Sequence, residues 1–167
     1  MNSPFEYRAV SLKEIDLRWQ KDINDNIKDT RWVGWKDANI LDNTTGRCKN
    51  FAVLHSGRPI GTGTLIFSPQ CGTINERLAL ADGKRIANIN SLRMDREYEG
   101  RGHMSRLVKI MELYAKEAEY TEATIGVEAG ETRNLGIYLH WGYNRLVLSE
   151  VEDGSLFLYY AKDLSLT

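Results

Sequence analysis

Two glycines, Gly100 and Gly102, stand between a strand-like and a helix-like stretch in DREYEGRGHMSRLVKIMELYAKE, residues 95–117. Glycine is favoured where the backbone turns tightly or comes close to a ligand. The stretch up to Met94 is expected to be a strand, and 103–119 has the clearest helical pattern, with apolar residues every three or four positions. A strand, a glycine turn and a helix in succession predict a layered protein in which helices pack on a sheet.

The same junction has the chemistry of an anion site. The first N–H groups of a helix have no internal acceptor, and the helix dipole places partial positive charge there. Glycines remove side chains that would keep a phosphate away from these groups. The pattern is not a Walker loop, because Gly-Lys-Ser/Thr is absent, and Ser105 stands where a dinucleotide fingerprint has its third glycine. The junction is therefore either a seat for a pyrophosphate or a structural turn.

The remaining pattern extends this layout along the chain. Ser11 and Glu14 form a capping box ahead of a helical apolar stripe, whereas Gly34 weakens the helix that follows. Asp82-Gly83 is a favoured turn pair. Strands are predicted at 5–10, 51–55, 60–67, 84–94, 122–129, 143–150 and 155–164, helices at 11–27, 30–41, 103–119 and 132–142, and a loop at 42–50. The predicted class is α/β, with a central mixed sheet flanked by helices.

Composition limits the kind of protein. At 167 residues the chain is expected to form one domain over 1–167. A net charge of −1 gives no sign of a nucleic-acid or membrane surface, and no apolar run approaches the ~20 residues of a membrane span. The start of the chain lacks a signal-peptide pattern, and Cys48 and Cys71 form no zinc motif, so we expect a cytoplasmic protein with free thiols and no metal.

Three stretches together resemble the GNAT superfamily of acyl-CoA-dependent N-acetyltransferases. SLRMDREYEGRGHMSRL (91–107) is similar to the family's segment from the fourth strand to the third helix, with its Gln/Arg-x-x-Gly-x-Gly/Ala core. TIGVEAGETRNLGIYLHWGYNRL (124–146) resembles its later Asn-x-x-Ala-x-x-x-Tyr segment, and LFLYYAKDL (156–164) its closing strand. Glu131 stands at the usual asparagine, while Asn134 matches a second asparagine found in many relatives. The predicted order of elements also matches that of the family.

The resemblance implies acetyl-CoA as co-substrate. The backbone of Leu92 and Met94 is implied to bind the pantetheine arm, and Asn134 to contact the cofactor. The pyrophosphate is implied to lie on the backbone of Gly100, Arg101, Gly102, His103, Met104 and Ser105. The acceptor amine then attacks the thioester directly in a ternary complex, and Tyr138 protonates the leaving thiolate. A phenol with a pKa near ~10 suits that task. The alternative for Tyr138 is a core aromatic on a short amphipathic helix.

A group must also accept the proton of the amine. Glu128 ends the strand TIGVE and alternates away from its apolar residues, so it is a candidate base, although it could equally be a solvated strand-end carboxylate. Glu76 and Asp82 are weaker candidates. The three histidines form no triad by spacing, and nothing in the sequence orders Cys71 as a nucleophile.

The acceptor itself is predicted only as a class, a small-molecule or peptidyl amine. The family's first two helices border the acceptor site, and the segment 18–43 carries three tryptophans among acidic residues. Such an aromatic and acidic wall would suit a cationic amine. The alternative is that the tryptophans fasten these helices to the sheet while the aspartates are solvated. The residues concerned are Trp19, Trp32, Trp35, Asp16, Asp22, Asp25, Asp29 and Asp37.

Two further hypotheses remain beside an active enzyme. Glu97 occupies the family's Gln/Arg position and Glu99 precedes the first glycine, and carboxylates pointing at a diphosphate are unfavourable unless Arg101 and Arg106 offset them. These departures favour a protein of this fold that binds acyl-CoA without turnover. An unrelated nucleotide-binding module is the third possibility. The apolar LFLYY of the last hairpin also suggests an edge through which a homodimer could form.

Overall fold

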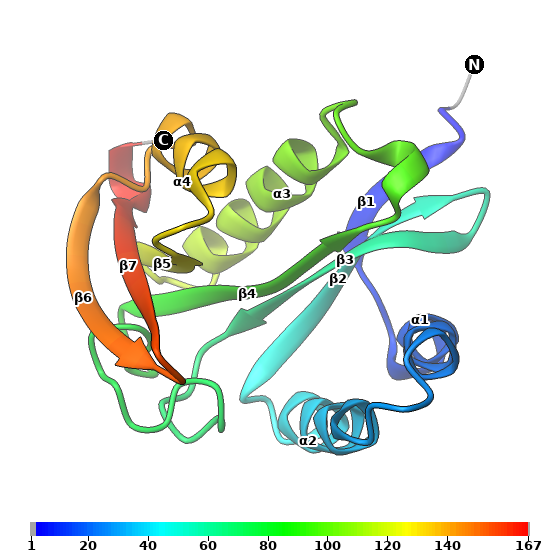
Figure 1. Cartoon of the computed structure of the whole chain (residues 1–167). Coiled ribbons are helices and arrows are strands. Elements are labelled where there is room, and N and C mark those ends of the chain that lie inside the picture. The colour runs from blue at the N-terminus through cyan, green and yellow to red at the C-terminus, as the bar shows by residue number, and fades with distance from the viewer. Residues whose placement is uncertain (1–2, 167) are drawn as a thin grey trace. The chain divides into compact units, whose positions relative to one another are not determined.

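The computed structural model of the chain describes residues 3–166. Seven strands form one sheet in the order β1-β2-β3-β4-β5-β7-β6 (Figure 1). The elements are β1 (Phe5–Ala9), α1 (Leu12–Asp25), α2 (Arg31–Thr44), β2 (Cys48–His55), β3 (Arg58–Ile66), β4 (Ile86–Met94), a 3₁₀ turn (Arg96–Tyr98), α3 (His103–Glu117), β5 (Glu122–Glu128), α4 (Thr132–His140), β6 (Arg145–Glu152), β7 (Ser155–Asp163) and a second 3₁₀ turn (Leu164–Leu166). The predicted order of elements and the α/β class are confirmed.

The sheet is mixed, because β4 pairs with β5 in parallel while β1–β2, β5–β7 and β6–β7 are antiparallel. The chain divides into two compact units, Met1–Leu65 with Ser91–Met111 and Ile66–Asn90 with Glu112–Thr167. The division passes through β4 and α3, and each unit is described below by itself. One domain over residues 1–167 remains a prediction.

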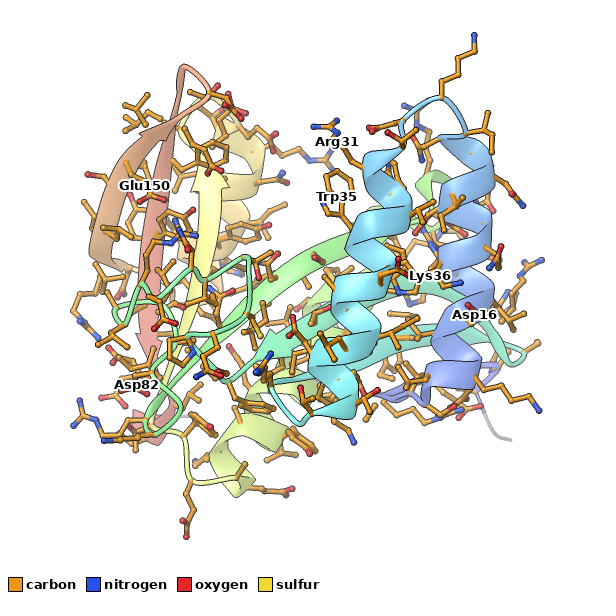
Figure 2. The ribbon with its side chains drawn as sticks, turned by 90° about the horizontal axis from the view of Figure 1, so that it is seen from below. Asp16, Arg31, Trp35, Lys36, Asp82 and Glu150 are labelled. Atoms are coloured by element: carbon orange, nitrogen blue, oxygen red, sulfur yellow. The ribbon has the colours of Figure 1, made fainter. Side chains whose placement is uncertain are left out.

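In the first unit, α1 and α2 lie side by side, and both contact β2 (Figures 1 and 2). The capping box predicted at the start of α1 is present: the Glu14 N–H donates to Ser11 Oγ and the Ser11 N–H donates to Glu14 Oε1. Lys36 on α2 points toward Asp16 on α1, with Nζ and Oδ1 2.7 Å apart (Figure 2). Beneath the helices, the apolar face of α1 buries a small cluster of Val10, Ile15, Ala52 and Leu54.

The predicted loop at 42–50 was wrong at both of its ends. Helix α2 continues to Thr44, where the hydroxyls of Thr44 and Thr45 donate to the carbonyls of Ile40 and Leu41. Strand β2 already begins at Cys48, so only three residues connect the two elements. Gly34, which weakens the helix on propensity alone, lies in its interior with no atom within 4 Å of where a Cβ would stand.

In the second unit, β5 pairs with β4 over Ile86–Ile89 and with β7 along its whole length. Strand β7 also pairs with β6, so the apolar LFLYY (156–160) lies in a strand with a neighbour on each side. The edge strand of the hairpin is therefore β6, where Leu146 and Val151 are exposed. The last hairpin, predicted as an edge for pairing between protomers, does lie at the edge of the sheet, and its outer strand is β6 rather than the strand that carries LFLYY.

The second unit also holds a buried charge. Tyr143 is fully buried, and its hydroxyl donates to Glu112 Oε2 at 2.6 Å. Lys162 Nζ donates to Glu112 Oε1 at 3.2 Å. Burial and the adjacent carboxylate raise the pKa of Tyr143 well above its usual value, so the phenol stays protonated and donates. The buried carboxylate thus depends on two donors from different elements.

Substitution Tyr143→Phe tests this dependence. Removing the hydroxyl leaves the Glu112 carboxylate with one donor fewer, and we expect the free energy of unfolding to fall by about 1–3 kcal/mol. Urea denaturation at pH 7 measures the change, with an unaltered m-value. Tyr160→Phe is the matched control, because the Tyr160 hydroxyl makes no hydrogen bond within residues 3–166, and its effect should stay below ~0.5 kcal/mol. Equal effects of the two substitutions would contradict the role of Glu112.

Candidate functional site

The glycine turn opens onto empty space at the start of α3. Gly100 and Gly102 have φ values of 74° and 82°, in the left-handed region that favours glycine. A Cβ on either residue would meet no atom within 4 Å. Helix α3 begins at His103, and its first hydrogen bond joins the Arg106 N–H to the Gly102 carbonyl at 3.2 Å. The predicted turn is present, and nothing in the described chain covers its glycines.

Charged side chains of both signs surround this turn. Arg101 and Arg106 are exposed, and each guanidinium lies over a tyrosine ring, 5.7 and 5.9 Å from guanidinium carbon to ring centroid. Glu97 and Glu99, the two carboxylates that depart from the family pattern, are also exposed. Exposed carboxylates are largely screened by solvent. Solvent screens the exposed Arg101 and Arg106 in the same way, so the turn has two cations and two carboxylates near it, and only charges that come into direct contact with a ligand act on it strongly.

His103 lies beneath the turn with its side chain buried. Its Nδ1 is 2.7 Å from the Tyr7 hydroxyl, and its ring centroid is 4.4 Å from that of Phe5. Burial lowers the pKa of His103, and the charges of Arg106 and Arg101 lower it further. Its ring therefore belongs to the packing under the turn, and its predicted part in a phosphate seat rests on its backbone N–H.

Strand β4 reaches this turn through an unusual residue. Ser91 has a φ of 54°, a left-handed conformation that costs energy in a residue other than glycine and that clusters at functional sites. Beyond it, Leu92 and Met94 pack over two glycines of β3. A Cβ at Gly61 would lie 2.6 Å from Met94 Cε, and one at Gly63 would lie 2.9 Å from Leu92 Cδ2. The sequence shows no signal for the conformation of Ser91.

The first unit contains a hollow that the sequence did not predict. It lies where α1 faces β2, β3 and β4, and it contains about 280 Å³ of space free of atoms, part of it open to solvent. Its polar lining includes the ion pair of Arg18 and Asp22 and the side chain of Arg93. The lining residues are Ile15, Arg18, Trp19, Asp22, Asn50, Thr62, Gly63, Thr64, Ser91 and Arg93. An arginine between Leu92 and Met94 in a strand was the available signal.

The expected aromatic and acidic wall is already engaged by the chain's own cations. The Arg93 guanidinium lies over Trp19 and Trp32, and that of Arg31 lies over Trp35, near one end of α2 (Figure 2). Four of the five aspartates also form ion pairs within the unit. The pairs are Asp16–Lys36, Asp22–Arg18, Asp25–Lys21 and Asp29–Arg31.

In the second unit, α4 carries Tyr138 and Asn134. Tyr138 is half-buried, with its ring centroid 5.5 Å from that of Trp141. Burial, and secondarily the charge of Glu131, raise the pKa of Tyr138 above its usual value. Asn134 Nδ2 donates to Glu131 Oε2 at 2.7 Å, so the amide is oriented by the residue that precedes the helix. Tyr138 is thus a phenol that keeps its proton at neutral pH.

The candidate bases also lie in this unit. Glu128 is half-buried at the end of β5, opposite Phe157 in β7. Asp82 has a structural role, because its Oδ1 accepts the backbone N–H groups of residues 84, 85 and 86 at 2.8–2.9 Å and so fixes the start of β4. Burial acts to raise the pKa of Asp82, but these donors outweigh it and the pKa is lowered, which makes Asp82 a weak base. Glu76 is exposed in the preceding loop, and Cys71 is buried.

Residues 3–166 hold no group of three His, Cys, Asp or Glu side chains placed to bind a metal ion. Nor does any helix in that range have the length and apolar character needed to cross a membrane.

The family model described as the acetyltransferase (GNAT) family matches residues 13–143, a span that includes the glycine turn, Glu128, Asn134 and Tyr138. This chain belongs to the GNAT acetyltransferase family. No curated protein sequence matches it.

Solved GNAT structures share the fold over nearly the whole chain. A GNAT family acetyltransferase from Elizabethkingia anophelis with acetyl-CoA bound is 13% identical with a TM-score of 0.62, covering 97% of this chain and 99% of its own. The Salmonella typhimurium acetyltransferase that modifies the N-terminal serine of ribosomal protein L7/L12 is 16% identical with a TM-score of 0.68, covering 97% and 96%. A spermidine N-acetyltransferase chimera from Vibrio cholerae and hSSAT is 16% identical with a TM-score of 0.68, covering 98% of each chain.

The residues predicted for the GNAT site fall into two groups. Leu92, Met94 and residues 100–105 belong to the first unit, whereas Glu128, Asn134 and Tyr138 belong to the second. The first group is brought together by β4, the glycine turn and the start of α3. The second group is held by the end of β5 and by α4. Their roles remain predictions.

Proposed function

We propose that this GNAT protein transfers the acetyl group of acetyl-CoA to a primary amine by direct attack in a ternary complex. The observation that carries the proposal is the open turn at Gly100 and Gly102, at the start of α3, in a chain that belongs to this family. Structures with this fold include one with acetyl-CoA bound and one in complex with coenzyme A. Their binding of these ligands supports acetyl-CoA as the donor here.

In this proposal the diphosphate lies on the backbone of residues 100–105. The unpaired N–H groups of the first turn of α3 donate to it, and Arg101 and Arg106 add positive charge. The pantetheine arm bonds to the backbone of Leu92 and Met94, beyond the four-residue ladder that joins β4 to β5. Asn134 contacts the same cofactor. The open space above both glycines supports this assignment.

The chemistry then requires one proton donor and one acceptor. The amine nitrogen attacks the thioester carbonyl, the C–S bond breaks, and the thiolate of CoA takes the proton of the Tyr138 hydroxyl. Glu128 accepts the proton that the amine loses, directly or through water. Tyr138 is protonated at neutral pH and so can donate, and the burial that raises its pKa makes it a weaker acid than a solvated phenol.

The acceptor in this proposal is a small-molecule or peptidyl amine. Neighbours of the same fold include enzymes named for a ribosomal protein N-terminus and for spermidine. A protein that binds acyl-CoA without turnover is the second candidate, favoured by Glu97 at the family's Gln/Arg position. Thiol release on a panel of amines distinguishes the two.

Substitution Gly102→Val tests the cofactor seat. The valine side chain would occupy the space above the turn, and we expect the affinity for CoA to fall by at least about tenfold. Gly57→Val is the matched control, because Gly57 has a φ of 80° in the β2–β3 turn and a Cβ there would also meet no atom within 4 Å. Both variants carry the same backbone strain, about 1–2 kcal/mol. Calorimetric titration with CoA should separate them, and wild-type affinity in Gly102→Val would mean that the glycine serves only the turn.

Substitution Tyr138→Phe tests the general acid. The ring and its packing on Trp141 remain, and only the transferable proton is lost. General acid catalysis is typically worth about 10²–10⁴-fold, so kcat should fall by that order while the affinity for acetyl-CoA changes little. Steady-state rates with an acceptor from the panel measure the effect, with Tyr160→Phe as the control and circular dichroism to compare folding. A kcat within about threefold of wild type would assign the proton to water instead.

We also propose a homodimer formed through β6, the edge strand with exposed Leu146 and Val151. Light scattering should then give a mass near twice the 19.1 kDa of one chain. Substituting arginine for both Leu146 and Val151 should reduce the measured mass to that of one chain. Leu113→Arg, at an exposed position on α3, should leave the dimer intact. A one-chain mass for the wild-type protein at every concentration would overturn the dimer.

A further inference from the structure

The hollow beside α1 adjoins the strand proposed to bind the acetyl donor. Ser91 and Arg93 both line it, and they flank Leu92 on β4. Every lining residue belongs to the first unit. The hollow is therefore placed to receive the acceptor, and its side chains define which acceptors fit.

The guanidinium of Arg93 lies over two indole rings. Its guanidinium carbon lies 4.6 Å from the ring centroid of Trp32 and 5.5 Å from that of Trp19. These are cation–π distances, so both rings attract the charge of the guanidinium. The hydrogen-bond donors of a guanidinium form a planar fork that matches a carboxylate. A cation–π contact uses none of these N–H groups as hydrogen-bond donors, so they can bind a polar partner.

One such donor is used within the chain. Arg93 Nη1 donates to Asp22 Oδ2 at 3.2 Å, and within residues 3–166 this is the only hydrogen bond of the Arg93 side chain. Asp22 is shared, because Arg18 Nε donates to its two oxygens at 3.2 and 3.3 Å. Arg18 also forms an ion pair with Asp95, with Nη1 and Oδ1 2.8 Å apart. Arg18 therefore pairs with two carboxylates, whereas Arg93 shares one carboxylate, that of Asp22, with Arg18.

The carboxylates at the hollow are shared unequally between its two arginines. Arg18 pairs with both Asp22 and Asp95, whereas Arg93 pairs with the same Asp22, so Arg93 is the less neutralised of the two. A cationic ligand would be repelled by Arg93, because the Arg93 guanidinium already lies over the indole rings that could bind a cation. A carboxylate can pair with this less neutralised guanidinium, whereas a dianionic phosphate would be repelled more strongly by the nearby Asp22. Thr62 lines the same space, and its hydroxyl can donate to a bound oxygen.

We propose that Arg93 binds a carboxylate of the acceptor, so that the substrates are primary amines that also carry a carboxylate, such as free amino acids. This inference rests on the proposed acetyl transfer, since it assigns the hollow to the acceptor of that reaction. The pairing is a charge-assisted fork of two N–H···O bonds, which is stronger and more directional than a single neutral hydrogen bond. Arg93 thereby selects the acceptor, and the indole rings of Trp19 and Trp32 keep it in place.

Matched acceptor pairs that differ only in the carboxylate test the proposal. The pairs are L-lysine and 1,5-diaminopentane, L-phenylalanine and 2-phenylethylamine, and 4-aminobutanoate and propylamine, each with acetyl-CoA and thiol release as the readout. We expect kcat/KM to favour the carboxylate member of at least one pair by about 10–100-fold in the wild-type protein. Arg93→Met should abolish that preference while changing the rate of the other member less than about threefold.

Two further variants control for packing and charge. Arg31→Met removes another arginine that lies over a tryptophan but does not line the hollow, and it should keep the wild-type preference. Arg93→Lys keeps the charge without the fork and should recover only part of the preference. Thermal unfolding of each variant establishes that it is folded.

The outcomes separate this proposal from acetyl transfer itself. Turnover without any preference for a carboxylate, or an equal loss for both members of a pair in Arg93→Met, would overturn the role of Arg93 while the enzyme activity stands. If no amine is acetylated, the proposed function fails. Saturation-transfer NMR, which measures binding of 4-aminobutanoate in the presence of CoA, then tests whether Arg93 binds a carboxylate. Binding to wild type and to Arg31→Met, but not to Arg93→Met, would sustain it. Absence of binding to wild type would overturn it.

Discussion

The backbone conformation of Gly100 and Gly102 is the constraint on which the proposed donor site depends. A helix can offer its first N–H groups to a ligand only if the chain leading into it turns away without side chains over them. Two left-handed residues two positions apart accomplish that turn, and glycine adopts the conformation without strain. The tyrosine rings under Arg101 and Arg106 and the buried His103 support the turn from within the first unit.

Local signals were sufficient for most of the fold. The Ser11–Glu14 capping box, the Gly turns and the apolar period of α3 placed the elements in their order, because each depends on residues close in sequence. The end of α2 was mistaken because threonine has a weak helix propensity, while the hydroxyls of Thr44 and Thr45 bond back to the preceding turn. The Gly100-x-Gly102 pattern predicted the glycine turn correctly, because this turn also depends only on residues close in sequence.

The acceptor side depended on long-range contacts that no local pattern encodes. Arg18–Asp22 and Lys21–Asp25 are four residues apart on α1, so their pairing was open to prediction from helical spacing. The cation–π contacts of Arg93 with Trp19 and Trp32 join residues from β4, α1 and α2. Tryptophans that suggested a wall for a foreign cation instead hold a cation of the protein itself. The left-handed Ser91 was equally hidden, because serine has no preference for that conformation.

The two cysteines have a consequence for how motion in this protein can be followed. Both are buried, which keeps reagents away from the sulfurs, and burial also raises the pKa of the Cys48 thiol to about 12, so little thiolate forms there in the folded chain. Cys48 belongs to the first compact unit and Cys71 to the second. Each sulfur becomes reactive only when its own surroundings open. The rates at which a thiol reagent labels the two cysteines therefore report the opening of the surroundings of each one separately, without an engineered cysteine.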